Sequence, residues 1–496
     1  MSEKNKFVII NSADNVAVAL SDLSAGETVD GFVLLDKIPF GHKFSIKEIK
    51  NGENIIKYGY PIGHATQDIK KGVHIHTHNL KTNLDGILEY SYHGPQQKKP
   101  IVNSFKNAVF QGYKRKSGGV GVRNEIWIIP TVGCVGTTAK ILERKANELF
   151  KNRTDGIFAF PHNMGCSQLG DDHLTTQNIL KGLINNPNAG GVLVLSLGCE
   201  NNNLESFKPV LGQYDSDRVK FLVAQNSDNE IEAGLKIIEE LVNYTSSFKR
   251  ETLPASKLIV GFKCGGSDAF SGITANPLCG IINDILTDIG GSTILTEVPE
   301  MFGAETLLME RAASKEVFDK TIDLINNFKK YFKKYNQVIY ENPSPGNKKG
   351  GVSSLEEKSL GCTQKSGLSL VVDVLDYGQN VKIHGLNLLA GPGNDQVSTT
   401  NLTASGAQII LFTTGRGNPF GAPVPTIKIS SNTNLFNYKN NWIDFDAGVI
   451  LKGIPVDEIA KEFFYFILDT ASGRIQTKNE INGYREISIF KNGVIL

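Results

Sequence analysis

The run Ile126-Trp127-Ile128-Ile129-Pro130-Thr131-Val132-Gly133-Cys134 is an almost unbroken apolar segment that ends in glycine and cysteine. Similar apolar runs end at Cys199 and Cys264, and amphipathic stretches such as residues 137–149 and 275–289 lie between them. Buried parallel strands joined by crossover helices produce this pattern. Residues from about 113 onward therefore predict a large α/β body with mostly parallel sheets of the Rossmann or flavodoxin-like kind, covered on both faces.

The first 92 residues have a different pattern. Short alternating apolar runs are separated by Gly and Asp turns, with little helical periodicity, which predicts a small β-rich unit. A polar stretch punctuated by Gly and Pro follows and is typical of a linker. We expect an N-terminal domain at 1–92, a linker at 93–112, a first α/β domain at 113–250 and a second α/β domain at 251–496.

Composition limits the classes of function. The chain has 496 residues, enough for about two to four domains. Its net charge is only +1, which argues against an extended nucleic-acid surface. No apolar run reaches the roughly 20 residues of a membrane helix, and residues 1–6 lack an apolar signal core. Six cysteines in so long a chain do not form a disulfide framework, so we expect a cytoplasmic protein that contacts neither nucleic acid nor membrane.

Histidines are concentrated in the segment Val73-His74-Ile75-His76-Thr77-His78. If this run is extended, its three imidazoles point to the same face, because strand side chains alternate. Neutral imidazoles on one face can bind a divalent transition metal. The alternative is an exposed edge strand with polar residues on its solvent face.

Polar, glycine-rich segments follow the apolar runs at residues 133–134, 162–168, 198–203 and 263–268. Ligands of open α/β sheets bind beyond the carboxyl ends of strands, so these segments are candidate site walls. Taken singly, each cysteine is better explained as a small buried hydrophobe. No Cys-x-x-Cys pair is present, which disfavours an iron–sulfur cluster, while a nucleophilic thiol stays open. Arg416 lies in another Gly-rich loop and could grip a carboxylate or form a surface salt bridge.

These motifs together resemble the altronate/galactarate dehydratase family of sugar-acid hydro-lyases. The matching segments cover essentially the whole chain: 41–44, 56–59, 73–79, 121–125, 130–134, 165–173, 197–202, 264–268, 295–305 and 340–348. Chain length and the tract around Tyr340 are most similar to the members that act on altronate. The resemblance implies a small β-clip (SAF-type) domain followed by an α/β catalytic body.

The resemblance also implies a reaction: loss of water from D-altronate to give 2-dehydro-3-deoxy-D-gluconate, a step of hexuronate catabolism. Dehydration of galactarate or another sugar acid, or a sulfo-lyase reaction on a hydroxy acid, is the alternative. A base removes the proton next to the carboxylate and an acid protonates the departing hydroxide. A divalent metal is implied as well, usually iron(II) with manganese(II) as the alternative, to stabilise the developing charge.

Residue roles are assigned from this resemblance. The metal is expected on His74 and His76, with Glu200 supplied by the α/β body. Acid–base roles are expected of His42, Lys263 or His162. The residues expected to contact the small sugar acid are Arg123, Asn124, Gln168, Asn202 and Arg416. Such a site would lie between the N-terminal domain and the body, where pockets often form. A homodimer is a possible assembly.

Overall fold

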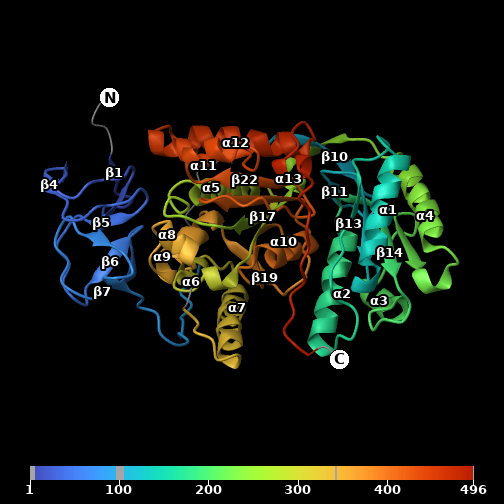
Figure 1. Ribbon diagram of the computed structural model, residues 1–496, viewed down its shortest axis with the longest axis horizontal. Coiled ribbons are helices and arrows are strands. Elements are labelled where there is room, and N and C mark those ends of the chain that lie inside the picture. Colours follow the sequence, from blue (N-terminus) through green and yellow to red (C-terminus); the bar gives the residue numbers. More distant parts are fainter. Residues whose placement is uncertain (1–5, 96–104, 341–342, 495–496) are drawn as a thin grey trace.

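The computed structural model describes residues 6–95, 105–340 and 343–494. Three units follow each other along the chain, and we call them the N-terminal unit (6–95), the second unit (105–250) and the third unit (251–494). In Figure 1 the third unit lies in the centre, with the N-terminal unit on its left and the second unit on its right. The chain therefore runs from one side of the molecule to the other before it forms the centre.

The N-terminal unit is built from short antiparallel strands. One sheet has the order β1 (Phe7–Val8), β2 (Val16–Ala19), β5 (Lys43–Ser45) and β8 (His74–Ile75). A second has the order β6 (Asn54–Lys57), β7 (Tyr60–Ala65) and β9 (Leu80–Lys81), and β3 (Thr28–Val29) pairs with β4 (Phe32–Val33). Ile55, Ile62 and Ile75 are completely buried between these elements. The prediction of a small β-rich first domain is confirmed.

The histidine segment is shorter as a strand than we expected. Strand β8 ends at Ile75, and the backbone N–H groups of Asn79 and Leu80 both donate to the carbonyl of His76. The prediction of an extended run through His78 is therefore wrong, because the chain turns after Ile75. The imidazoles are brought together across this turn instead of along one strand face.

The second unit is a parallel sheet with helices on both faces. Its strand order is β13 (Ile157–Ala159), β12 (Glu125–Pro130), β14 (Ala189–Ser196) and β15 (Val219–Val223). Helices α1 (Gly136–Leu149) and α4 (Glu230–Thr245) share one hydrophobic core with the sheet, while α2 (Gly170–Asn185) and α3 (Leu204–Leu211) share another. Every residue of β12 and β14 is buried, as their unbroken apolar runs predict.

The third unit contains a seven-stranded parallel sheet. The strand order is β19 (Val371–Leu375), β20 (Gly385–Leu389), β18 (Ser292–Leu295), β17 (Ile259–Cys264), β21 (Ile409–Thr414), β22 (Thr426–Ser430) and β23 (Phe445–Asp446). All six strand pairings are parallel. The expected α/β body with parallel sheets is thus confirmed, in the form of two separate sheets.

Helices surround this sheet. They are α5 (Ala275–Asp288), α6 (Glu305–Met309), α7 (Lys315–Lys334), α8 (Pro345–Lys349), α9 (Leu355–Thr363), α10 (Asp395–Ala404), α11 (Thr433–Tyr438), α12 (Val456–Ala471) and α13 (Lys478–Ile481). Helix α10 packs on α2 of the second unit, where a Cβ on Gly182 would lie 2.3 Å from the carbonyl oxygen of Ala404. This contact joins the two parallel sheets into one structure. No helix among the described residues is both long enough and apolar enough to cross a membrane.

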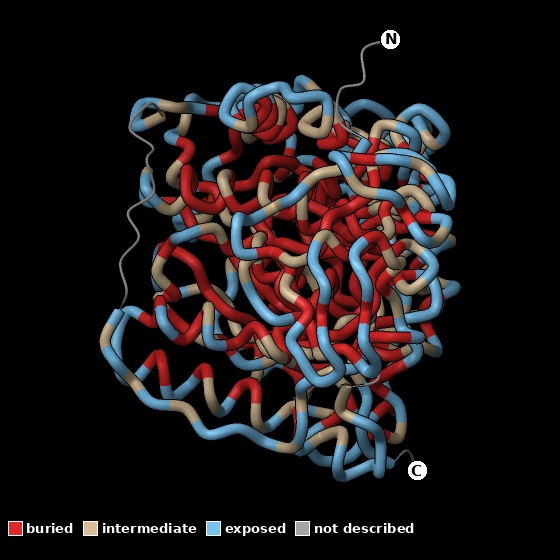
Figure 2. Tube along the Cα trace, turned by 90° about the vertical axis from the view of Figure 1, so that its left-hand side faces the viewer, coloured by how far each residue is buried: buried red, intermediate tan, exposed pale blue. Residues whose placement is uncertain are grey.

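A three-stranded antiparallel sheet links the second and third units. Strand β10 (Val109–Lys114) pairs with β11 (Val120–Gly121) on one side and with β16 (Glu251–Pro254) on the other. Strand β10 thus begins inside the segment predicted as a linker, of which residues 96–104 lie outside the described residues. Figure 2 shows that buried chain fills the interior of the molecule beneath exposed loops.

The N-terminal unit is attached to the third unit by a buried ionic contact. Glu357 of α9 accepts from Lys43 Nζ at 2.8 Å and from Lys57 Nζ at 2.7 Å, and all three side chains are about 1% exposed. Burial alone raises the pKa of Glu357, but the two ammonium groups hold it at about 2. Lys43 also donates to the carbonyl of Gly351 at 3.1 Å. One carboxylate therefore compensates two buried cations from two different strands.

Replacing this carboxylate should destabilise the protein strongly. The substitution Glu357→Gln leaves two ammonium groups buried without a counter-charge, so we expect the free energy of unfolding to fall by about 3–5 kcal/mol. Calorimetry at neutral pH would show this as a lower Tm. The control is Asp68→Asn, which removes the partner of Lys50 in an ion pair whose side chains are 65% and 64% exposed, and should leave Tm nearly unchanged. Equal Tm values for the two variants would contradict the assigned role of Glu357.

Candidate active site

A cavity of about 580 Å³ opens in the third unit. Its volume lies within the range of small-molecule sites. Its apolar lining residues include Phe328, Tyr331, Phe332, Ile339 and Phe490. Its polar lining residues include Cys264, Glu300, Asn347, Lys348, Lys358 and Asp395. We take this cavity as the candidate active site, because charged groups of both signs converge on it.

The cavity begins at the carboxyl end of strand β17, where ligands of parallel sheets usually bind. Cys264 is the last residue of β17, and Gly265 and Gly266 continue the cavity wall. Asp395 is the first residue of helix α10. The short helix α8 contributes Asn347 and Lys348. Residues far apart in the sequence therefore meet at one edge of the sheet.

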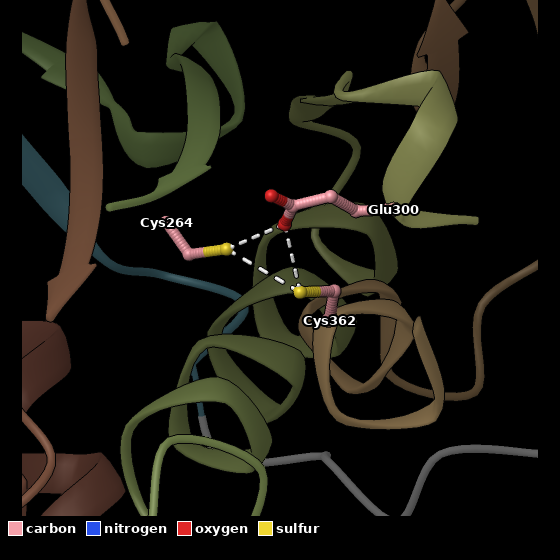
Figure 3. Close-up of side chains that lie close together, drawn as sticks. All are labelled: Cys264, Glu300 and Cys362. Carbon is pink, nitrogen blue, oxygen red and sulfur yellow. Dashed lines mark hydrogen bonds between the residues drawn. The ribbon is translucent and has the colours of Figure 1, made fainter. Parts of the chain in front are cut away.

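Two thiols and a carboxylate form a compact group beside the cavity, which we call the thiol–carboxylate group (Cys264, Glu300 and Cys362; Figure 3). The Sγ atoms of Cys264 and Cys362 are 3.3 Å apart, and each lies 2.9 Å from Oε2 of Glu300. All three residues are buried. Among the described residues, no other trio of His, Cys, Asp or Glu brings its ligand atoms this close together.

Lysines and carboxylates alternate around this group. Lys358 Nζ lies 2.7 Å from Glu300 Oε1, Lys365 Nζ lies 2.9 Å from Glu297 Oε2, and Lys263 also pairs with Glu297. Burial raises the pKa of Glu300, but the neighbouring ammonium groups of Lys358 and Lys263 bring it well below its ordinary value. These ammonium and carboxylate groups are therefore paired with each other inside the protein.

Lys263 does not line the cavity but contacts two residues that do, Asp395 and Gly393. Its Nζ lies 2.9 Å from Asp395 Oδ1 and 3.1 Å from the carbonyl oxygen of Gly393. Burial lowers the pKa of Lys263, but the carboxylates of Glu297 and Asp395 more than reverse this and raise it above its ordinary value. A lysine held as an ammonium cannot accept a proton. The structure thus argues against Lys263 as a base and makes it a counter-ion that orients Asp395.

Four histidines of the N-terminal unit lie together and contact helix α8. The rings of His42, His74 and His76 are stacked or tilted with centroids 5.2–5.7 Å apart, and His78 lies 5.5 Å from His74. His76 Nε2 is 2.9 Å from the carbonyl oxygen of Lys348, and His42 Nε2 is 3.3 Å from that of Lys349. A carbonyl oxygen only accepts, so these two Nε2 atoms carry a hydrogen, while Nδ1 of His42 lies 3.0 Å from His74 Nε2 and Nδ1 of His76 lies 3.1 Å from Thr77 Oγ1. We call His42, His74, His76 and His78 the histidine cluster. It binds the backbone of α8, and residues of α8 line the cavity.

The predicted metal set of His74, His76 and Glu200 does not come together. Glu200 belongs to the second unit, on the opposite side of the third unit from the histidines (Figure 1). Its Oε1 accepts from Thr131 Oγ1 and Ser196 Oγ, each at 2.6 Å, and its Oε2 accepts from the backbone N–H of Gly198. The prediction that these residues share a metal is wrong, because the seven-stranded unit lies between them.

Other predicted site residues in the second unit also hold structure together. His162 Nε2 donates to the carbonyl of Pro130, and desolvation lowers the pKa of His162 to about 4. Gln168 accepts from the backbone N–H of Gly165, and Asn202 donates to the carbonyl of Thr131. Neither these three residues nor His42 lines the cavity. At the strand ends of this smaller sheet, these polar side chains are already hydrogen-bonded within the protein. This argues against the predicted acid–base role of His162 and the predicted substrate contacts of Gln168 and Asn202.

Arg123 and Asn124 connect elements of the fold. Arg123 binds both carboxylate oxygens of Glu480, at 2.7 and 3.0 Å, and also donates to two backbone carbonyls. Asn124 accepts from Arg115 and donates to the carbonyl of Thr245. Both side chains are buried, so the predicted contacts with a substrate are wrong for this geometry.

Arg416 has a different setting. Its side chain is exposed, and its backbone N–H donates to the carbonyl of Gly266, a residue of the cavity wall. The loop that carries Arg416 therefore borders the cavity. That the Arg416 guanidinium binds a substrate carboxylate stays a prediction. Glu300, Lys358, Cys362 and Asp395 were not predicted as site residues. The run 295–305, which matches the family, contained a signal for Glu300.

The histidine cluster should make attachment of the N-terminal unit sensitive to acid. Burial, and then the neighbouring rings of His42 and His76, lower the pKa of His74 to about 3. Its unfolded-state pKa is about 6.5, so the unfolded chain takes up a proton first and stability falls as the pH drops below about 6.5. We expect Tm to fall less between pH 7 and pH 5 in His74→Asn than in the unsubstituted protein. The exposed His93→Asn is the control, and parallel Tm curves for all three proteins would contradict this role.

Comparisons with known proteins agree with this architecture. Family profiles match the altronate/galactarate dehydratase SAF domain at residues 5–83, the second domain of D-galactarate dehydratase/altronate hydrolase at 112–246, and the C-terminal domain of D-galactarate/altronate dehydratase at 255–495. The chain is 51% identical to altronate dehydratase of Bacillus subtilis (strain 168), over 99% of both chains. It is 48% identical to altronate dehydratase of Escherichia coli (strain K12), over 99% of this chain and 100% of that protein.

A third relative is more distant. Galactarate dehydratase (L-threo-forming) of Escherichia coli (strain K12) is 34% identical over 98% of this chain and 96% of its own length. All three units of the structure are thus covered by family profiles and by full-length relatives. The chain belongs to the altronate/galactarate dehydratase family.

Proposed function

We propose that this chain is a hydro-lyase that removes water from D-altronate and yields 2-dehydro-3-deoxy-D-gluconate. The observation that carries this proposal is the 51% and 48% identity to two altronate dehydratases over nearly the whole chain. The galactarate dehydratase is only 34% identical. Altronate is therefore favoured over galactarate as the substrate.

The cavity holds groups that can bind the carboxylate of a sugar acid and remove a proton from it. A sugar acid carries a carboxylate, and the ammonium group of Lys358 lies in the cavity wall to receive it. Burial lowers the pKa of Lys358, but Glu300 raises it above its ordinary value, so the group stays charged. Lys348 lines the same cavity and can donate to hydroxyl groups, whereas the amide of Asn347 is held by Ser267, Ser344 and Lys358.

Asp395 is the base that we propose for removal of the proton next to the carboxylate. Its side chain is 30% exposed at the cavity. Oδ1 is held by Lys263, and Oδ2 accepts from Asn418 Nδ2 at 2.7 Å, so the carboxylate is fixed in one orientation. A positioned base contributes about 10²–10⁴-fold to such a reaction.

We propose iron(II) as the metal, with manganese(II) as the alternative. The predicted set of His74, His76 and Glu200 does not come together, because Glu200 lies in the second unit, on the opposite side of the third unit from the histidines. The thiol–carboxylate group fits, since thiolate and carboxylate are both metal ligands. When bound there, a divalent ion supplies Lewis-acid stabilisation of the charge that develops on the substrate carboxylate.

We also propose that the protein works in the cytoplasm on a small sugar acid. All six cysteines are free, which supports a reducing compartment. The homodimer stays a prediction.

Substrate and base can be tested together. Anaerobically purified protein with iron(II) is incubated with D-altronate, galactarate and other sugar acids, and 2-keto acids are measured. We expect product from D-altronate and a loss of about 10²–10⁴-fold in kcat for Asp395→Asn.

The matched control is Asp376→Asn, an exposed carboxylate that lines a neighbouring cavity and should keep normal turnover. Product from galactarate but not from altronate would contradict D-altronate as the substrate. A normal kcat in Asp395→Asn would contradict the proposed role of Asp395 as the base.

A further inference from the structure

We infer that Cys264, Glu300 and Cys362 bind one divalent transition-metal ion through two thiolates and one carboxylate, at the wall of the cavity. The inference rests on the proposed function only for the identity of that ion as iron(II). The three ligands come from strand β17, from the short 3₁₀ helix Val298–Glu300 and from helix α9. Three separate elements are thus needed to assemble the site.

The spacing of the donor atoms suits one ion. The two sulfur atoms are 3.3 Å apart, too far for a disulfide bond of about 2.05 Å, and each is 2.9 Å from the same carboxylate oxygen. With metal–sulfur bonds of about 2.3 Å and metal–oxygen bonds of about 2.1 Å, these separations correspond to angles of about 80–90° at the ion. Three such donors form one face of an octahedron, as in iron(II) sites that keep open positions for substrate.

The open side of this group faces the cavity. Cys264 and Glu300 are part of the cavity wall, whereas Cys362 lies behind them in α9. Lys358, which pairs with Glu300, is also in the wall. A ligand in the cavity can therefore reach the ion while its carboxylate contacts this lysine.

Charge balance is compatible with a divalent ion. Around the group, Lys263, Lys358 and Lys365 match the three carboxylates Glu297, Glu300 and Asp395. Two thiolates and one divalent cation add no net charge to this balanced set. Thiolates bind borderline and soft metals in preference to magnesium or calcium.

The competing explanation is that both cysteines are neutral thiols that donate to Glu300 and bind nothing. It predicts no thiolate–metal bond, whatever metal is offered. An iron–sulfur cluster is a second alternative, and it would contain acid-labile sulfide. Among the described residues no third cysteine joins the group, since Cys279 is buried in α5 outside it.

Cobalt(II) tests the site directly, because its thiolate complexes absorb in the near ultraviolet while its carboxylate and aquo complexes do not. The exposed Cys134, Cys166 and Cys199 are first replaced by Ser so that they cannot contribute. Metal-free protein is then titrated with cobalt(II) without oxygen. We expect one cobalt per chain with a thiolate band.

Cys264→Ser and Cys362→Ser should each weaken binding by at least about 100-fold and reduce the band. Cys279→Ser, a buried cysteine outside the group, should keep both properties. Glu300→Gln should weaken binding while the thiolate band persists at saturation. Circular dichroism and Tm confirm that each variant is folded.

Absence of a thiolate band in the starting protein, an undiminished band in both cysteine variants, or stoichiometric acid-labile sulfide would overturn the site. Altronate turnover without the band would overturn the site and leave the proposed function standing. The band without altronate turnover would support the site and overturn the proposed substrate.

Discussion

The carboxylate of Glu357 is the contact on which the candidate site depends. It joins Lys43 and Lys57 of the N-terminal unit to helix α9 of the third unit in a place that water does not reach. The same helix carries Lys358 and Cys362, which face Glu300. Because ionic contacts in a buried setting tolerate little displacement, the position of α9 is set by this attachment.

The histidine cluster extends the same attachment to helix α8. His42 and His76 bind the backbone carbonyls of Lys349 and Lys348, while Asn347 and Lys348 line the cavity. The N-terminal unit therefore positions two helices of the site without contributing a side chain to the cavity wall. Its contribution to function, in this view, is to hold α8 and α9 against the seven-stranded sheet.

Much of the architecture could be predicted from local pattern. The apolar runs ending at Cys134, Cys199 and Cys264 are three strands, and the β-rich first domain is present. The site was predicted less well, because polar strand ends occur in both parallel sheets. In the smaller sheet Glu200, Gln168 and Asn202 are satisfied by neighbouring backbone and hydroxyl groups. At the larger sheet, charged residues such as Lys358 and Asp395 line a cavity.

Local patterns were enough to predict the family, the order of the domains and the kind of strand in each, because hydrophobic periodicity and long motifs are properties of neighbouring residues. Which polar residues form the candidate site depends on how distant segments pack together. Cys264 and Cys362 are 98 positions apart and meet through packing of α9 beside β17, a proximity that no local pattern encodes. Tertiary packing also places His42 and His76 against the backbone carbonyls of Lys349 and Lys348, because the chain turns after Ile75 and contacts α8.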